Sequence, residues 1–222
     1  MCVCIEGCVG QLMKIQVALD TVSLGEGIKI VSEVEGHIDF IEIGTPMIFR
    51  YGLQAVTEMK RAYPHHKIVF DGKIADAGYY EAMMAFEAGA DIVTVLAVSD
   101  DATILSAVRA AKECDKKVLA DLIHVPNIGQ RAKELIELEV DYIGIHIGVD
   151  TQKENREFDS EFTALEGIVS SEKIAVAGGI NPDLALKIKK YNPGVVIVGG
   201  FLAKAKNKEQ AVLNLKKNLK ER

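Results

Sequence analysis

Short apolar runs alternate with longer stretches of helical period along the whole chain. The runs are rich in β-branched residues, and most lack strict polar–apolar alternation, which is typical of parallel strands buried on both faces. They are separated by roughly 20 to 30 residues, enough for a crossover between parallel strands. The predicted strands cover residues 15–19, 38–43, 68–70, 92–96, 118–122, 142–146, 174–177 and 195–198.

The stretches between these runs predict amphipathic helices. Proline stands in the first turn of several of them, and glycine follows the end of others, as expected at helix boundaries. The predicted helices cover residues 21–34, 46–62, 76–88, 101–112, 126–138, 158–169, 182–191 and 202–219. Alternating strands and helices indicate a parallel sheet with right-handed crossovers. Eight units favour closure into a single (β/α)₈ barrel, with a doubly wound open sheet as the alternative.

The domain boundaries follow from the first strand. The chain has 222 residues, short for this barrel but within its range of about 200 upward. We expect one barrel domain over residues 13–222, preceded by an extension, residues 1–12, that contains Cys2, Cys4 and Cys8. Those cysteines allow a metal or redox site, but without a fourth ligand nearby they make a weak zinc motif. An extension ahead of the domain is the favoured interpretation.

Composition narrows the class of protein. The formal net charge is −6, so the basic surplus typical of nucleic-acid-binding domains is missing. No apolar run approaches the roughly 18 residues needed to cross a membrane. No basic segment followed by an apolar one marks a signal peptide at the N-terminus. We therefore expect a cytoplasmic enzyme without a nucleic-acid or membrane partner.

Charged residues recur at the carboxyl ends of the predicted strands, where a (β/α)₈ barrel builds its active site. Such groups must be solvated, paired or bound to a metal. Asp20 or Asp121 alone is explained equally well as a helix N-cap or a surface charge. Their occurrence together on several strands favours a catalytic site. The strand-end residues are Asp20, Glu42, Asp71, Asp121 and His146.

Glu42 and Asp71 end neighbouring strands and are candidates to share one hard cation. Magnesium prefers oxygen ligands, few protein carboxylates, several waters and substrate oxygens. A site with two carboxylates and a sugar diol suits that preference. Alternatively, Glu42 simply pairs with Lys73.

The segment Asp71-Gly72-Lys73-Ile74-Ala75-Asp76 is the most specific local pattern. Lys73 between two aspartates is expected to stay charged, and beside a metal it can stabilise negative charge on an enediolate. Asp76 is either part of this site or only the N-cap of the next helix.

His146 is the candidate for proton transfer, because histidine titrates near neutral pH. A hydrogen-bonded core histidine is the alternative, and His124 is the second candidate base. Phosphate is expected at two glycine pairs that follow strands seven and eight, where backbone amides and a helix N-terminus commonly bind it in this fold. These pairs are Gly178-Gly179 and Gly199-Gly200.

Several stretches together resemble the orotidine monophosphate decarboxylase suprafamily, and within it the 3-hexulose-6-phosphate synthases. They include Asp71-x-Lys73-x-x-Asp76, residues 16–20 ending in Ala18-Leu19-Asp20, and the stretches 41–46, 90–95, 121–123, 131–135, 140–143 and 176–180. The resemblance runs from about Met13 to the C-terminus. It implies a homodimer whose active sites lie near the interface. In this dimer, Asp76 of each subunit would contribute to the active site of the other.

The resemblance also implies a reaction: reversible condensation of formaldehyde with ribulose 5-phosphate to hex-3-ulose 6-phosphate, through an enediolate stabilised by Mg²⁺. Glu42 and Asp71 would hold the ion. Asp20, Lys73, His146 and Asp76 would surround the sugar phosphate, with Asp121 among the substrate contacts.

Two other functions remain open. The sequence motif Lys73-Ile74-Ala75-Asp76 is more typical of 3-keto-L-gulonate 6-phosphate decarboxylases. Against this, those enzymes have arginines where this chain has Val149 and Gly200, and glutamate where it has Asp121. A catalytically silent barrel that serves as a binding partner is the third possibility, which the charge at the strand ends disfavours.

Overall fold

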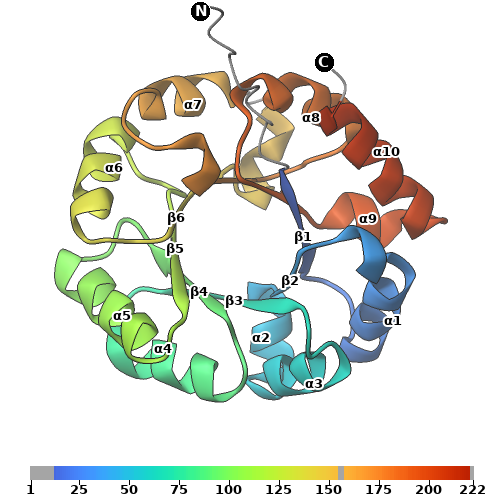
Figure 1. The fold of residues 1–222 in the computed structure, drawn as a ribbon, viewed down its shortest axis with the longest axis horizontal. Coiled ribbons are helices and arrows are strands. Elements are labelled where there is room, and N and C mark those ends of the chain that lie inside the picture. Colours follow the sequence, from blue (N-terminus) through green and yellow to red (C-terminus); the bar gives the residue numbers. More distant parts are fainter. Residues whose placement is uncertain (1–12, 155–157, 221–222) are drawn as a thin grey trace, which may run out of the picture.

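The strands close into one parallel barrel surrounded by helices, as Figure 1 shows in a view along the barrel axis. The computed structural model describes residues 13–154 and 158–220. Each strand pairs in parallel with the next, and β8 pairs with β1. The predicted barrel is confirmed, and the open sheet is wrong. The strands are β1 (Lys14–Leu19), β2 (Phe40–Ile43), β3 (Lys67–Ile74), β4 (Ile92–Leu96), β5 (Lys117–Asp121), β6 (Tyr142–His146), β7 (Ile174–Ala177) and β8 (Val195–Val198).

The helices follow the predicted order, but two predicted helices are each divided in two. The segment 46–62 forms α2 and α3, because Gly52 takes a φ of 58° and donates its N–H to Ile48 O, which ends α2. The segment 202–219 forms α9 and α10. The helices are α1 (Leu24–Val34), α2 (Thr45–Tyr51), α3 (Gln54–Ala62), α4 (Gly78–Glu87), α5 (Asp101–Glu113), α6 (Ile128–Glu137), α7 (Asp159–Leu165), α8 (Pro182–Ile188), α9 (Gly200–Lys204) and α10 (Lys208–Lys220), with short 3-10 turns at Glu35–His37, Val149–Glu154, Ser171–Lys173 and Lys189–Tyr191.

Strand β3 runs four residues beyond its predicted end at Phe70. Its register with β4 shifts between Phe70 and Ile74, and Lys73 inside this bulge has a φ of 48°. A left-handed backbone is uncommon for a residue other than glycine and is found in bulges that redirect side chains. The segment predicted as a loop after β3 is therefore an irregular part of the strand.

The barrel interior changes from apolar to polar along its axis. Its lower layer is a buried cluster formed by Phe40, Val69, Ile92, Leu119, Tyr142, Ala175 and Val195. Because side chains in a strand alternate between faces, the residue two positions later faces inward again, one layer higher. In β2, β3 and β5 these later residues are Glu42, Asp71 and Asp121. The two-residue period of the strands thus places three carboxylates one layer above the apolar cluster.

The base of the barrel carries a repeated polar contact. Three aspartates, each directly before an even-numbered strand, accept the backbone N–H of the second residue of the preceding strand: Asp39 from Ile15, Asp91 from Ile68 and Asp141 from Val118, at 2.8–3.0 Å. The fourth equivalent position is Gly194, where an added Cβ would lie 1.9 Å from Glu172 O. The backbones approach too closely there for an aspartate.

The extension predicted at residues 1–12, with Cys2, Cys4 and Cys8, lies outside the described residues. Cys114, at the end of α5, is a free thiol whose Sγ lies 3.5 Å from Met83 Sδ. Within the part of the chain that the structure describes, no helix combines the length and the apolar character that a membrane span requires.

Candidate functional site

Asp71 is the most heavily coordinated carboxylate at the mouth of the barrel. Its Oδ1 accepts the Thr94 hydroxyl at 2.8 Å, and its Oδ2 accepts Thr45 Oγ1 at 2.9 Å and Lys73 Nζ at 2.5 Å. Asp71 is 6% exposed. Asp71 is therefore held in one orientation from three sides.

Lys73 links Asp71 on β3 to Asp121 on β5, two strands along the barrel. Its Nζ lies 3.9 Å from Asp121 Oδ2. Burial lowers the pKa of Lys73, but the carboxylates of Asp71, Asp121 and Glu42 more than offset this, and the pKa is raised overall. Lys73 is thus a fixed positive charge in the centre of the site. The alternative in which Glu42 simply pairs with Lys73 is not what the structure shows, since the direct ion pair is with Asp71.

Asp121 and His146 form a second pair. Asp121 Oδ2 lies 2.7 Å from His146 Nδ1, and Asp121 Oδ1 accepts the backbone N–H of Ile123 at 2.9 Å. A carboxylate on Nδ1 fixes the imidazole orientation and leaves Nε2 for another partner. The side chain of His146 is 20% exposed, so this histidine is not fully enclosed in the core. The geometry makes Asp121 the orienting partner of His146.

The surroundings of Glu42 and Asp20 disfavour their ionised forms. Burial raises the pKa of Glu42 well above its usual value, and the charges of Asp71 and Asp20 raise it further. Burial also raises the pKa of Asp20, followed by the charge of Asp71. Gln16 Nε2 donates to Glu42 Oε2 at 2.5 Å. Three acidic groups thus crowd together with Lys73 as the nearby cation.

Asp20 reaches this cluster because the neighbouring strands leave room for it. A Cβ added to Gly44 would lie 2.1 Å from Asp20 Oδ1, and one added to Gly199 would lie 3.2 Å from Asp20 Oδ2. Glycine at these two positions therefore lets the carboxylate lie between the ends of β2 and β8. This contact also places Gly199 beside the acidic cluster.

The predicted phosphate loops lie at the ends of β7 and β8. Gly178 and Gly179 have φ values of 115° and 66°, and Gly199 is the N-cap of α9. The space beside Gly200 is open, since nothing lies within 4 Å of an added Cβ. Exposed backbone with left-handed glycines suits close approach by an anion.

Asp76 lies apart from the residues described so far. It is exposed, and its Oδ1 accepts the N–H of Ala77 at 2.7 Å. Helix α4 begins later than predicted, with Ala77 as its N-cap, so Asp76 is not the cap.

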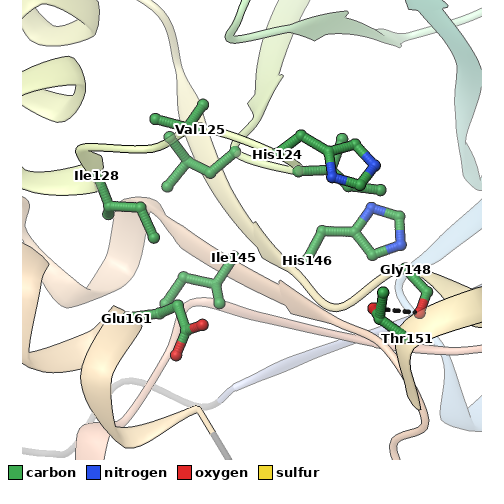
Figure 2. Close-up of a pocket in the computed structure, with 10 residues that line it drawn as sticks. His124, Val125, Ile128, Ile145, His146, Gly148, Thr151 and Glu161 are labelled. Atoms are coloured by element: carbon green, nitrogen blue, oxygen red, sulfur yellow. Dashed lines mark hydrogen bonds between the residues drawn. The ribbon is translucent and has the colours of Figure 1, made fainter. Parts of the chain in front are cut away.

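His124 and His146 border a pocket beside the mouth, and Figure 2 shows their rings on the same side of it. Ile145 and Ile128 line the other part, with Glu161 from α7. Since Ile145 points away from the barrel interior, this pocket lies mainly between β6 and the helices α6 and α7. It meets the carboxylate site only at His146.

The acidic cluster fits a magnesium ion by the chemistry of its donors. Glu42 and Asp20 are crowded by Asp71, and a divalent cation would relieve the repulsion that raises their pKa values. Among the described residues, no group of three or more His, Cys, Asp and Glu side chains is arranged to hold a metal by itself. Magnesium does not need such a cage, because it retains waters and takes substrate oxygens.

Three supporting residues were not among the site residues predicted from the sequence: Gln16, Thr45 and Thr94. Gln16 and Thr94 are buried to 1% and 4% exposure and face the interior of the barrel. The signal was available, since each is a polar residue at an inward position of an otherwise apolar strand. Thr45 gave no such signal, because its role depends on how α2 follows β2.

Comparison with known proteins identifies the family. Residues 13–215 match the family described as Orotidine 5'-phosphate decarboxylase / HUMPS family. The chain belongs to this family.

Within the family, the chain is 47% identical to the 3-hexulose-6-phosphate synthase of Bacillus subtilis (strain 168), over 92% of this chain and 97% of the relative. The crystal structure of 3-hexulose-6-phosphate synthase from Salmonella typhimurium matches with a TM-score of 0.89 at 37% identity, over 93% of this chain and 98% of the other. That of 3-keto-L-gulonate-6-phosphate decarboxylase from Vibrio cholerae O1 biovar El Tor str. N16961 gives 0.82 at 27%, over 93% and 97%. The resemblance inferred from the motifs is confirmed.

Proposed function

We propose that this chain catalyses the reversible aldol condensation of formaldehyde with ribulose 5-phosphate to hex-3-ulose 6-phosphate. The observation that carries the proposal is the linked set Asp71–Lys73–Asp121–His146 beside Glu42, which joins a fixed cation, an oriented base and an acidic cluster in one mouth. The 47% identity to a protein named for this activity supports it independently.

In the proposed reaction His146 is the base. Its Nε2 removes a proton from C1 of ribulose 5-phosphate, and the electron pair forms the C1–C2 double bond of an enediolate as the C2 carbonyl gains negative charge. C1 then attacks the formaldehyde carbon. The alkoxide that forms on the former formaldehyde oxygen takes the proton from His146, so atoms and charge balance. The reverse direction uses the same groups.

Lys73 stabilises the negative charge that develops on the substrate oxygens, because its ammonium is fixed between Asp71 and Asp121 before the substrate binds. Asp121 orients His146 throughout. The loops at Gly178 and Gly199 bind the phosphate through backbone amides, which holds C1 over the carboxylate cluster.

Mg²⁺, held by Glu42 and Asp71, would supply Lewis-acid stabilisation of the substrate's carbonyl and adjacent hydroxyl oxygens. Asp20 lies beside Gly44 and Gly199, between the metal ligands and the phosphate loop, and is suited to contact the sugar hydroxyls.

The chain is also proposed to act as a homodimer. Large apolar side chains are exposed on α4, which follows Asp76, and on the adjacent α5: Tyr80, Met84 and Leu105 are between 52% and 74% exposed, and Phe49 on α2 is 89% exposed. Exposed apolar side chains on neighbouring helices typically mark protein interfaces. Asp76, exposed at the start of this region, would then enter the partner's site.

A subunit-mixing experiment tests the role of Asp76 across the interface. Asp76→Ala and Lys73→Ala are each expected to be nearly inactive. When the two variants are denatured and refolded together in equal amounts, half of the dimers contain one subunit of each. If Asp76 acts across the interface, each of these mixed dimers has one intact site. About a quarter of wild-type activity should return. If Asp76 acts within its own subunit, activity should not recover.

The main test is incubation with ribulose 5-phosphate, formaldehyde and Mg²⁺, followed by identification of the product. We expect hex-3-ulose 6-phosphate, with activity lost on chelation. Release of carbon dioxide from 3-keto-L-gulonate 6-phosphate at a higher kcat/KM would favour the decarboxylase, a family neighbour that shares the enediolate. Inactivity in both assays would indicate a barrel that only binds.

A further inference from the structure

Thr94 joins the two functional residues of the β3 bulge through one hydroxyl. Its Oγ1 accepts the backbone N–H of Lys73 at 3.0 Å and donates to Asp71 Oδ1 at 2.8 Å. The side chain is 4% exposed and comes from the neighbouring strand β4. A single buried side chain therefore contacts both the backbone of the candidate electrophile and the carboxylate of a candidate metal ligand.

The direction of this hydrogen-bond chain is fixed. A backbone N–H can only donate, so the Thr94 oxygen must accept from Lys73, and its single proton is left for Asp71. The chain therefore runs from Lys73 N–H through Thr94 to Asp71.

The Lys73 backbone needs such a partner. Its φ of 48° is unfavourable for a residue with a Cβ. The bulge also takes Lys73 out of regular pairing, since the register with β4 is broken between Phe70 and Ile74. The Thr94 hydroxyl provides the acceptor that the ladder does not provide at this point.

We infer that Thr94 is a positioning residue for the proposed aldol reaction, which sets the left-handed backbone of Lys73 and the orientation of Asp71 together. The inference rests on the proposed function. Thr94 does not touch substrate in this role. It acts by aiming Lys73 Nζ between Asp71 and Asp121 and by turning one Asp71 oxygen away from Lys73.

Thr45 provides a contrast within the same site. Its hydroxyl contacts the Asp71 carboxylate, the Asp71 carbonyl and Lys73 Nζ at 2.7–3.2 Å, but not the Lys73 backbone. Loss of Thr45 would leave the bulge anchored, whereas loss of the Thr94 hydroxyl would release it. Thr94→Val should therefore be more damaging than Thr45→Val.

The test compares Thr94→Val, which keeps the shape and removes the hydroxyl, with Thr94→Ser, which keeps the hydroxyl. We expect Thr94→Val to lower kcat about 10- to 100-fold with KM changed less than about threefold, and to weaken binding of Mg²⁺ alone about tenfold in calorimetry. Thr94→Ser should remain within about threefold of wild type in both. Thr57→Val, which alters an exposed threonine of α3, is the matched control.

Hydrogen exchange adds a readout that needs no substrate: the Lys73 amide should exchange faster in Thr94→Val than in wild type. If Thr94→Val folds poorly, Thr94→Ala removes the same hydroxyl without the extra methyl. Wild-type kcat and Mg²⁺ affinity in a folded hydroxyl-free variant would overturn the inference. If wild type itself makes no hexulose phosphate, the proposed function fails, while exchange and Mg²⁺ binding still decide the role of Thr94.

Discussion

The base and the mouth of this barrel both contain acidic side chains, but their electrostatic surroundings are opposite. At the base, Asp91 is 5% exposed, yet it accepts Ile68 N–H and contacts Lys60 and Lys116. Burial alone would raise the pKa of Asp91, but these lysines and the amide lower it to about 2. At the mouth, the half-buried Asp20 and the buried Glu42 lie near Asp71, and their pKa values are raised.

Acidic side chains thus stabilise the fold at the base and form the candidate active site at the mouth. The base is also repetitive: β1, β3 and β5 start with lysine and a β-branched residue, Lys173 and Ile174 stand at the same place where β7 begins, and three of the four even strands are preceded by aspartate. The mouth has no such repeat, since each strand end carries different chemistry. Charges are satisfied at the base, whereas at the mouth they are left partly unsatisfied for a cation and a substrate.

The largest expected effect is on turnover at the mouth. Lys73→Ala should reduce aldol turnover by about 10³-fold, because the developing negative charge loses a fixed ammonium. Turnover should be compared per folded molecule, because removing the ammonium leaves the carboxylates of Asp71, Asp121 and Glu42 without their cation and also lowers stability. Lys67→Ala, at the opposite end of the same strand and 62% exposed, should keep near-normal turnover. Comparable losses in both variants would contradict the division between base and mouth.

The next effect is on stability at the base. Asp91→Asn should lower the free energy of unfolding by about 3 kcal/mol, because buried charge-assisted hydrogen bonds are broken. Asp141, which is 34% exposed and has one lysine at 3.6 Å, serves as a graded comparison, and Asp141→Asn should cost about 1 kcal/mol. Denaturant titration measures both. Turnover per folded molecule should stay within about threefold of wild type, and a larger loss would mean that the base acts on the site.

Acid should weaken the base through Asp91. Asp91 has a folded pKa of about 2 against 3.8 for the free group. Its contribution, on the order of 2 kcal/mol, is therefore present above about pH 4 and lost as the pH falls toward 2. The pH dependence of unfolding, compared between wild type and Asp91→Asn, measures it. Parallel curves for the two proteins between pH 4 and 2 would show that Asp91 is not responsible.

The smallest effect has the opposite sign. A carboxyl with a raised folded pKa contributes stability below its unfolded pKa, and this contribution is lost as the pH rises through the folded value. Glu42 should thus destabilise the metal-free protein at alkaline pH. Glu42→Gln is expected to stabilise it by about 1 kcal/mol at pH 8 and to abolish further stabilisation by Mg²⁺. Thermal unfolding with and without Mg²⁺ measures both effects. A lower melting temperature of the metal-free variant would contradict the expected destabilisation by Glu42.

Most of the fold was predictable from local patterns. Apolar runs and helical stretches identified the strands closely because each is buried on both faces, and eight of them indicated a closed barrel. The errors fell where tertiary contacts override the local pattern. The break at Gly52 comes from a left-handed glycine that ends α2. At the start of α4, Gly78 packs closely against α5, where an added Cβ would lie 2.1 Å from Thr103 O.

The order of residues along the chain was enough to predict which chemical groups stand at the strand ends, because the strand period and the parallel arrangement leave little choice of face or edge. It did not determine which group pairs with which. Only the tertiary structure joined Lys73 to Asp71, Asp121 to His146 and Thr94 to both ends of the bulge. Those pairings depend on the register between strands and on one left-handed residue, and both are stabilised by contacts from residues far away in the chain.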